Sequence, residues 1–323
     1  MWTEKYRPQS LDAIVNQEEI VSRFKNFVAE KNLPHLLLVG PAGIGKTTSI
    51  LALAKDLYGP SYRSFILELN ASDERGISVI REKVKNFART AAIASPVKFK
   101  ILIMDEADHL TSDAQHALRR TMEIYTKTCR FCLLGNYSEK IIDPIQSRCS
   151  VFRFNPLSES DLKGHLEYIS EVENIDIVEE GLDAIYQAGN GDVRKSINLL
   201  QAAAANQKQI DDVSIYDLLG NVSPKAVKDM VDTALSGDFQ SGRELLRDLL
   251  ITQGLAPEDI IRNIYKEIMR HSNLSEKWKV KLSDTLGTID YRLTQGSRPE
   301  IQLSTLLAHL SVVGEEMNEP SVD

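Results

Sequence analysis

The sequence predicts an α/β chain in which a parallel sheet covered by helices is followed by a small helical unit and an all-helical C-terminal domain. Two observations lead to this prediction. In the first half, five short apolar runs alternate with longer amphipathic segments, as in parallel sheets that are buried on both faces. After residue 156 the strand pattern stops, and apolar residues recur with helical spacing to about residue 314.

Size and composition narrow the class of protein. A chain of 323 residues has room for two or three domains. No apolar run approaches the roughly 20 residues of a membrane span, and the first residues lack the apolar core of a signal peptide, so no membrane partner is expected. The net charge of −8 argues against binding nucleic acid through bulk positive charge, although a local basic stripe remains possible.

The five apolar runs have the length of strands and define the first domain, residues 1–156. They are HLLLVG, FILELN, KILIMDE, RFCLLGN and SVFRFN, at residues 35–40, 65–70, 100–106, 130–136 and 150–155. Cys129 and Cys132 have CxxC spacing but fall inside an apolar run, where a metal or redox pair would lack partners. We therefore expect buried, reduced thiols and a reducing compartment.

Helical segments follow Pro156. The stretch LSESDLKGHLEYISEVEN starts with a capping-type serine, Ser158, and two further helical stretches follow it. We assign residues 157–220 to a small helical domain. Pro224 lies near a helix start and marks the next boundary, so residues 221–323 form an all-helical third domain.

A phosphate-binding loop follows the first strand. Residues 40–48 read GPAGIGKTT and fit G-x-x-x-x-G-K-[ST], whose glycines let backbone N–H groups curl inward around phosphate oxygens. Lys46 would reach the β and γ phosphates of ATP, Thr47 would hold Mg²⁺, and the next helix adds the positive end of its dipole. The predicted loop contacts are Gly40, Pro41, Ala42, Gly43, Ile44, Gly45, Lys46, Thr47 and Thr48.

Polar residues end the third and fourth strands. Asp105 and Glu106 follow four apolar residues and would lie at the carboxyl edge of the sheet, where open α/β sheets bind ligands. Asp105 would complete the Mg²⁺ shell, and Glu106 would act as general base on a water attacking the γ-phosphate. Asn136 would emerge beside Glu106 if the two strands are neighbours, although Asn at a strand end is usually a turn former.

These motifs together resemble AAA+ ATPases, and more narrowly the small subunits of replication factor C, the archaeal and eukaryotic sliding-clamp loader. The resemblance covers about the first 220 residues. Its boxes are WTEKYRP at 2–8, LNASDERGI at 69–77, DEAD at 105–108, DAQHALRRTME at 113–123, SRC at 147–149 and GDVRKSINLLQ at 191–201. A mild departure is Ala42, where a proline or glycine is common; it is not a defining glycine of the loop.

The resemblance implies roles that spacing alone does not indicate. Arg148 of the SRC box would be an arginine finger that reaches the γ-phosphate of the neighbouring subunit, whereas a lone arginine is most often solvated. Asn136 would be the first sensor of the nucleotide. Arg194 would be the second sensor, carried by the helical lid and acting in cis. Thr3 and Val15 would line the adenine and ribose pocket.

A basic stripe is the candidate DNA contact. Residues 75–89 hold five bases and one acid, and Arg81, Lys85 and Arg89 recur at i, i+4 and i+8, apart from an apolar helix face. By itself such a stripe is usually a solvated face. The resemblance implies that it faces a central chamber and follows the backbone of primer–template DNA, without reading bases.

The resemblance implies an ATPase that helps to open a sliding clamp and to load it onto primer–template DNA. Expected partners are the clamp, a large subunit and other small subunits, in a hetero-pentamer joined through a C-terminal collar. The compartment would be the archaeal cytoplasm, or the nucleus if the source is eukaryotic.

Two alternatives stay open. One is an AAA+ motor, such as a branch-migration helicase or protein remodeller. The other is a scaffold that binds ATP without hydrolysis, against which the complete set of catalytic residues argues.

Overall fold

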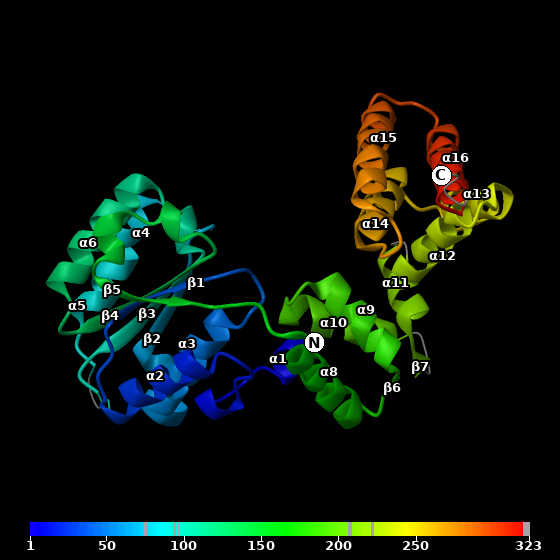
Figure 1. Ribbon diagram of the computed structural model, residues 1–323. Helices are drawn as coiled ribbons and strands as arrows, with labels where there is room; N and C mark the ends of the chain where they lie inside the picture. Colours follow the sequence, from blue (N-terminus) through cyan, green and yellow to red (C-terminus); the bar gives the residue numbers. More distant parts are fainter. Residues whose placement is uncertain (74–75, 93–94, 96, 206–208, 221–222, 319–323) are drawn as a thin grey trace. The chain divides into compact units, whose positions relative to one another are not determined.

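The computed structural model describes residues 1–73, 76–92, 95, 97–205, 209–220 and 223–318 (Figure 1). Its backbone divides into two compact units, Met1–Gln209 and Ile210–Asp323. The division into three domains at residues 156 and 220 stays a prediction. Residues 221–222, at the second predicted boundary, lie outside the described residues.

A five-stranded parallel sheet forms the centre of the first unit, with the strand order β2-β3-β4-β1-β5. The strands are β1 (His35–Val39), β2 (Ile66–Asn70), β3 (Lys100–Asp105), β4 (Cys129–Gly135) and β5 (Cys149–Arg153). All neighbouring strands pair in parallel. The five predicted strands are therefore confirmed as members of one parallel sheet.

Helices precede β1 and occupy the connections between the strands. In chain order they are α1 (Trp2–Lys5), η1 (Leu11–Ala13), α2 (Glu18–Ala29), α3 (Lys46–Tyr58), η2 (Gly59–Phe65), α4 (Ile77–Val79), the π-helical turn η3 (Ile80–Val84), α5 (Lys85–Arg89), η4 (Ala107–His109), α6 (Ser112–Ile124), η5 (Ser138–Lys140) and α7 (Asp143–Gln146).

Side chains of the strands alternate between two cores, because successive strand residues point to opposite faces of the sheet. In β1, Leu36 and Leu38 pack with buried residues of α2 and α3. Leu37 and Val39 pack in the other core, with buried residues of η3, α5 and α6. Both faces of the sheet are thus covered by helices, as predicted (Figure 1).

The strand order decides which loops meet. Because the strands are parallel, the segments that follow Val39, Asp105 and Gly135 leave the sheet at the same carboxyl edge. Strand β4 lies between β1 and β3, so the segment after Gly135 emerges between the phosphate loop and the acidic pair. The sheet therefore brings three of the predicted motifs to one place.

Three helices complete the first unit and lie in the segment predicted to form the helical lid. They are α8 (Glu159–Glu173), α9 (Glu179–Gly189) and α10 (Val193–Ala204). The Ser158 hydroxyl accepts a 3.2 Å hydrogen bond from the backbone N–H of Asp161, which confirms the predicted cap. A small sheet of β6 (Asp176–Ile177) and β7 (Gln209–Ile210) was not predicted, because two-residue strands show no periodicity.

The second unit is helical, as predicted for this part of the chain. Its helices are α11 (Asp212–Leu219), α12 (Pro224–Leu235), α13 (Phe239–Arg247), the π-helical turn η6 (Asp248–Thr252), α14 (Pro257–Arg270), α15 (Glu276–Thr294) and α16 (Pro299–Asn318). Met230, Ile264, Leu286 and Leu306 belong to its buried core. Within the described ranges of the whole chain, no helix combines the length and the apolar character that a bilayer crossing requires.

The cysteines are free thiols, and two of them are buried in β4. Burial raises the pKa of Cys129 to about 12 and the pKa of Cys132 well above its usual range. Cys149 is half-buried, and burial raises its pKa to about 12 as well. Because the thiolate is the reactive form, such thiols are poor nucleophiles. The expected burial of Cys129 and Cys132 is confirmed.

His35 opens β1, and its burial predicts a pH dependence of stability. Its Nδ1 accepts a 3.1 Å hydrogen bond from the backbone N–H of Phe131, and burial, helped by the Arg130 guanidinium, lowers its pKa from 6.5 to about 4. As the pH falls, His35 is protonated in the unfolded chain at a higher pH than in the folded chain. Protonation therefore favours the unfolded state, and the free energy of unfolding decreases. We expect His35 to contribute a fall of about 2 kcal/mol in the free energy of unfolding between about pH 7 and pH 4.5.

Chemical denaturation of the chain and of the His35→Gln variant at both pH values checks this prediction. The variant should lose less stability on acidification, because it lacks the titrating group. Equal losses in the two proteins would contradict the assignment to His35.

Candidate nucleotide-binding site

The phosphate loop connects β1 to α3 and requires glycine at specific positions. Gly43 and Gly45 have φ angles of 72° and 93°, in the left-handed region that side chains disfavour. A side chain at Gly43 would also collide with the Asp192 carboxylate. The loop therefore keeps its backbone open at the N-terminus of a 13-residue helix, a geometry that suits phosphate groups.

Lys46 connects this loop to the end of β4. Its Nζ donates hydrogen bonds to the carbonyl oxygens of Gly40 at 2.6 Å and Pro41 at 2.7 Å, and to Asn136 Oδ1 at 3.2 Å. Burial lowers the pKa of Lys46, and the Asp105 carboxylate acts against this shift. The sheet thus brings the lysine and the asparagine, 90 residues apart, into direct contact.

Thr47 and Asp105 form the candidate metal position. The Thr47 hydroxyl donates a 2.8 Å hydrogen bond to Asp105 Oδ2. A hydroxyl and a carboxylate beside a phosphate loop are the oxygen ligands that Mg²⁺ uses together with phosphate oxygens. The donor set therefore fits magnesium.

Glu106 follows β3 in the left-handed conformation, with a φ angle of 53°. Such a conformation costs about 1–3 kcal/mol in a residue with a side chain and is typical of functional sites. The Glu106 carboxylate lies 3.4 Å from His109 Nδ1 and lines the same pocket as Asn136. The two strands that carry Glu106 and Asn136 are neighbours, which was the condition for their proximity.

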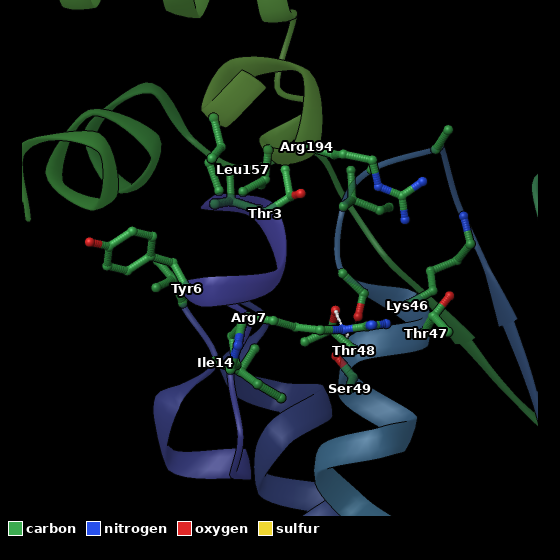
Figure 2. A pocket seen from close by; sticks show the side chains of 18 of the residues that line it. Thr3, Tyr6, Arg7, Ile14, Lys46, Thr47, Thr48, Ser49, Leu157 and Arg194 are labelled. Atoms are coloured by element: carbon green, nitrogen blue, oxygen red, sulfur yellow. Dashed lines mark hydrogen bonds between the residues drawn. The ribbon is translucent and has the colours of Figure 1, made fainter. Parts of the chain in front are cut away.

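A single pocket collects most of the predicted nucleotide residues (Figure 2). Those that line it are Thr3, Val15, Ala42, Gly43, Ile44, Gly45, Lys46, Thr47, Thr48, Asp105, Glu106, Asn136 and Arg194. Gly40 and Pro41 contribute carbonyl oxygens to Lys46 but do not line the pocket. Figure 2 shows Arg194 extending from α10 into the pocket on the side of Lys46.

The N-terminal segment contributes contacts that the sequence did not specify. Arg7 Nε donates a 3.3 Å hydrogen bond to the Thr48 hydroxyl, the contact drawn in Figure 2. The Tyr6 hydroxyl donates a 2.6 Å hydrogen bond to Glu173 at the end of α8. The segment thus connects the helix of the phosphate loop to the lid.

Two other side chains near the nucleotide site were not predicted. His165 of α8 lines the pocket, and burial lowers its pKa. One histidine in an amphipathic helix has no recognisable pattern, so the sequence offered no signal for it. Asp108 is 6% exposed, and neither carboxylate oxygen has a hydrogen-bond partner among the described residues. Its charge opposes the lowering of the Lys46 pKa, a role that its position in the DEAD box does not disclose.

Arg148 lies far from the pocket of its own chain. It precedes β5, whose first residue, Cys149, pairs with His35 at the start of β1. The phosphate loop leaves β1 at the other end, about 16 Å away for a strand of this length. Because this span exceeds the reach of an arginine side chain, Arg148 cannot touch its own phosphate loop.

The basic stripe lies on η3 and α5. Arg81, Lys85 and Arg89 are exposed, while Ile80 and Val84 are buried against the sheet. The π-helical turn interrupts the regular helix expected here, and the three bases still share the exposed side. Arg75, the first base of the predicted segment, lies outside the described residues.

Two protein families match parts of the chain. Residues 36–157 match the ATPase family associated with various cellular activities (AAA). Residues 222–309 match the replication factor C C-terminal domain. The two matches correspond to the sheet with its phosphate loop and to most of the helical second unit.

Curated relatives match almost the whole chain. The replication factor C small subunit of Staphylothermus marinus is 51% identical over 318 residues, covering 98% of this chain and 96% of the relative. That of Sulfurisphaera tokodaii is 52% identical over 317 residues, with coverages of 98% and 96%. That of Archaeoglobus fulgidus is 48% identical over 316 residues and covers 98% of each chain.

Solved structures resemble the chain at lower identity. The Holliday junction branch migration motor RuvB of Thermotoga maritima has a TM-score of 0.55 and 17% identity, and covers 84% of this chain and 92% of its own. A single-residue variant of the same motor has a TM-score of 0.56 and 16% identity, with the same coverages. At this identity the likeness concerns the fold alone.

Proposed function

The chain belongs to the family of replication factor C small subunits, and from this membership we propose how its nucleotide site works in clamp loading. It is an ATPase and an ATP-dependent clamp-loader subunit of DNA replication. The observation that carries this conclusion is about 50% identity over nearly the whole chain. The converging phosphate loop, acidic pair and Asn136 are what such a subunit needs in order to hydrolyse ATP.

ATP is proposed to bind across the phosphate loop. The loop N–H groups and the N-terminus of α3 receive the phosphates, and Lys46 exchanges its carbonyl partners for the β and γ phosphates. Thr47 and Asp105 would hold Mg²⁺, which, when bound, neutralises charge on the phosphates. Thr3 and Val15 line the pocket for adenine and ribose. Arg194, on the helical lid, contacts the phosphates.

Hydrolysis is proposed to use residues at the carboxyl edge of the sheet. Glu106 takes a proton from the water that attacks the γ-phosphate, and Asn136 holds that water with a neutral amide. Lys46 stays charged near the phosphates and stabilises the developing negative charge. The pocket that these three residues share supports this assignment.

Arg148 is proposed to complete the site of a neighbouring subunit. Its position at the amino end of the sheet supports action in trans, because its own phosphate loop is out of reach. A guanidinium stabilises charge on the transferring phosphoryl group, so a site without its neighbour hydrolyses ATP slowly. Hydrolysis would then depend on subunit packing.

The proposed assembly is a hetero-pentamer with a large subunit and further small subunits, which holds the sliding clamp and primer–template DNA. Residues 1–156 would form the ATPase domain, 157–220 the lid and 221–323 the collar that joins the subunits. The relatives named above are archaeal, and the proposed compartment is accordingly the cytoplasm.

ATPase turnover with and without clamp and primed DNA, measured after co-purification with the large subunit, tests this function. We expect weak basal turnover that DNA and clamp together stimulate. A closed hexamer by mass measurement, with turnover indifferent to the clamp, would instead indicate a motor. No turnover under any condition would indicate a scaffold.

The basic stripe provides a prediction about DNA. Replacing Arg81, Lys85 and Arg89 together by alanine should weaken DNA stimulation and leave ATP binding unchanged, because the three exposed bases are proposed to contact phosphates. Each lost phosphate contact should reduce the slope of log K against log[salt] by about 0.9. DNA binding measured at several salt concentrations gives this slope.

A matched control removes three exposed bases of the second unit, Lys225, Lys228 and Lys266. The control lowers the net charge by the same amount, so a bulk-charge effect would weaken DNA binding equally in both variants. Equal losses would contradict a local DNA contact at the stripe.

A further inference from the structure

Three oxygen atoms of its own chain contact the guanidinium of Arg148. Its Nη2 lies 2.6 Å from Glu123 Oε1, and its Nη1 donates hydrogen bonds to the Pro144 carbonyl oxygen at 2.6 Å and to the Ser147 hydroxyl at 3.4 Å. Arg148 follows α7 and Glu123 lies in the last turn of α6, so tertiary packing brings them together across 25 residues of sequence. The side chains are 37% and 39% exposed, so the pair remains accessible to a partner.

Glu123 also lies 3.5 Å from Arg119 Nε, one turn earlier on α6. One carboxylate therefore lies between two guanidinium groups, and the cluster Arg119–Glu123–Arg148 keeps a net charge of +1. Glu123 lies in the last turn of its helix, where the helix dipole disfavours an acid. Its interactions with the two arginines offset this disfavoured placement.

We propose that Glu123 is a positioning residue that sets Arg148 for the γ-phosphate of the neighbouring subunit. This inference rests on the proposed role of Arg148 in trans. A guanidinium has five N–H donors, and the contacts to Glu123, Pro144 and Ser147 use three of them. The remaining donors are available to phosphate oxygens, so the finger can bind phosphate without releasing Glu123.

Because Glu123 already holds the Arg148 side chain, contact with the phosphate costs less conformational entropy. A free arginine side chain loses rotamer freedom when it contacts a phosphate, and a side chain that is already ordered loses less. The paired Arg119 compensates the negative charge of Glu123, so the cluster still attracts an anion. Glu123 therefore acts on the hydrolysis step through Arg148, without touching nucleotide.

Single-turnover hydrolysis by the complete complex, with clamp and primed DNA, tests the proposal. The small subunits carry Glu123→Gln, Arg148→Ala or both changes. We expect Glu123→Gln to lower the rate about two- to five-fold, the effect of a partly exposed ion pair. The double variant should hydrolyse ATP at the rate of Arg148→Ala alone, because Glu123 has no other route to the reaction.

Two further measurements separate positioning from a general structural effect. ATP affinity of the isolated chain should be unchanged in Glu123→Gln, since this residue contacts Arg148 at the amino end of the sheet, remote from the phosphate loop of its own chain. Glu171→Gln removes the same charge from an exposed position on α8 and should leave the rate unchanged. Glu123→Asp keeps the charge on a shorter side chain and should retain more of the rate than Glu123→Gln.

The outcomes distinguish the inference from the proposed function on which it rests. An unchanged rate in Arg148→Ala would overturn the finger role itself. A reduced rate in Arg148→Ala, with Glu123→Gln behaving like Glu171→Gln, would overturn only the positioning role. A faster rate in Glu123→Gln would also overturn it, because Glu123 would then withhold the arginine. A Glu123 effect that persists in full when Arg148 is absent would overturn it as well.

Discussion

Replacement of Glu106 by glutamine is expected to leave ATP binding intact and to reduce turnover about 10²- to 10⁴-fold. Glutamine keeps the size of the side chain and accepts hydrogen bonds, but it cannot take a proton from the attacking water. The groups proposed to bind phosphate are the loop and Lys46, whose hydrogen bonds do not involve Glu106. The variant should therefore bind ATP with unchanged affinity and hydrolyse it much more slowly.

Equilibrium ATP binding and single-turnover hydrolysis, both measured on the assembled complex, check this expectation. Glu171→Gln again serves as the control for loss of one exposed carboxylate that does not line the pocket. Turnover equal to that of the unmodified complex would remove the assignment of Glu106 as general base. A parallel loss of ATP affinity would instead indicate that Glu106 supports the architecture of the site.

Replacement of Arg148 by alanine should reduce hydrolysis about 10³-fold or more at each interface that uses it. The guanidinium is the one group proposed to enter the site from the neighbouring subunit, so its loss leaves the γ-phosphate charge without that partner. ATP binding to the isolated chain should not change, because Arg148 and the phosphate loop lie at opposite ends of β1. Arg148→Lys should hydrolyse ATP little faster than Arg148→Ala, since an ammonium cannot form two parallel hydrogen bonds.

Mixed assemblies decide whether this arginine acts in trans. Subunits with Lys46→Ala lack a working phosphate loop but keep Arg148, whereas Arg148→Ala subunits keep the loop. When the two kinds are neighbours, an intact arginine can serve an intact loop, and part of the turnover should return. Failure to recover any turnover in mixed complexes of confirmed composition would contradict the trans role.

Local patterns in the sequence predicted the five strands of the main sheet and the candidate phosphate and magnesium residues. Five apolar runs predicted the five strands, because a strand buried on both faces requires apolar residues throughout. The loop from Gly40 to Thr47 could be recognised because phosphate binding constrains consecutive residues. The pair Asp105 and Glu106 could be recognised because a buried strand ends there. Each of these constraints acts within about ten residues, so sequence spacing reveals it.

The tertiary structure alone decided which of these parts meet. The order β2-β3-β4-β1-β5 places Asn136 within hydrogen-bonding distance of Lys46 and directs Thr47 to Asp105. It also separates Arg148 from its own phosphate loop, whereas the packing of α6 near α7 brings Glu123 to that arginine. Strand order and helix packing depend on contacts between residues far apart in the chain. No local periodicity encodes them, and they appear only when the chain is folded.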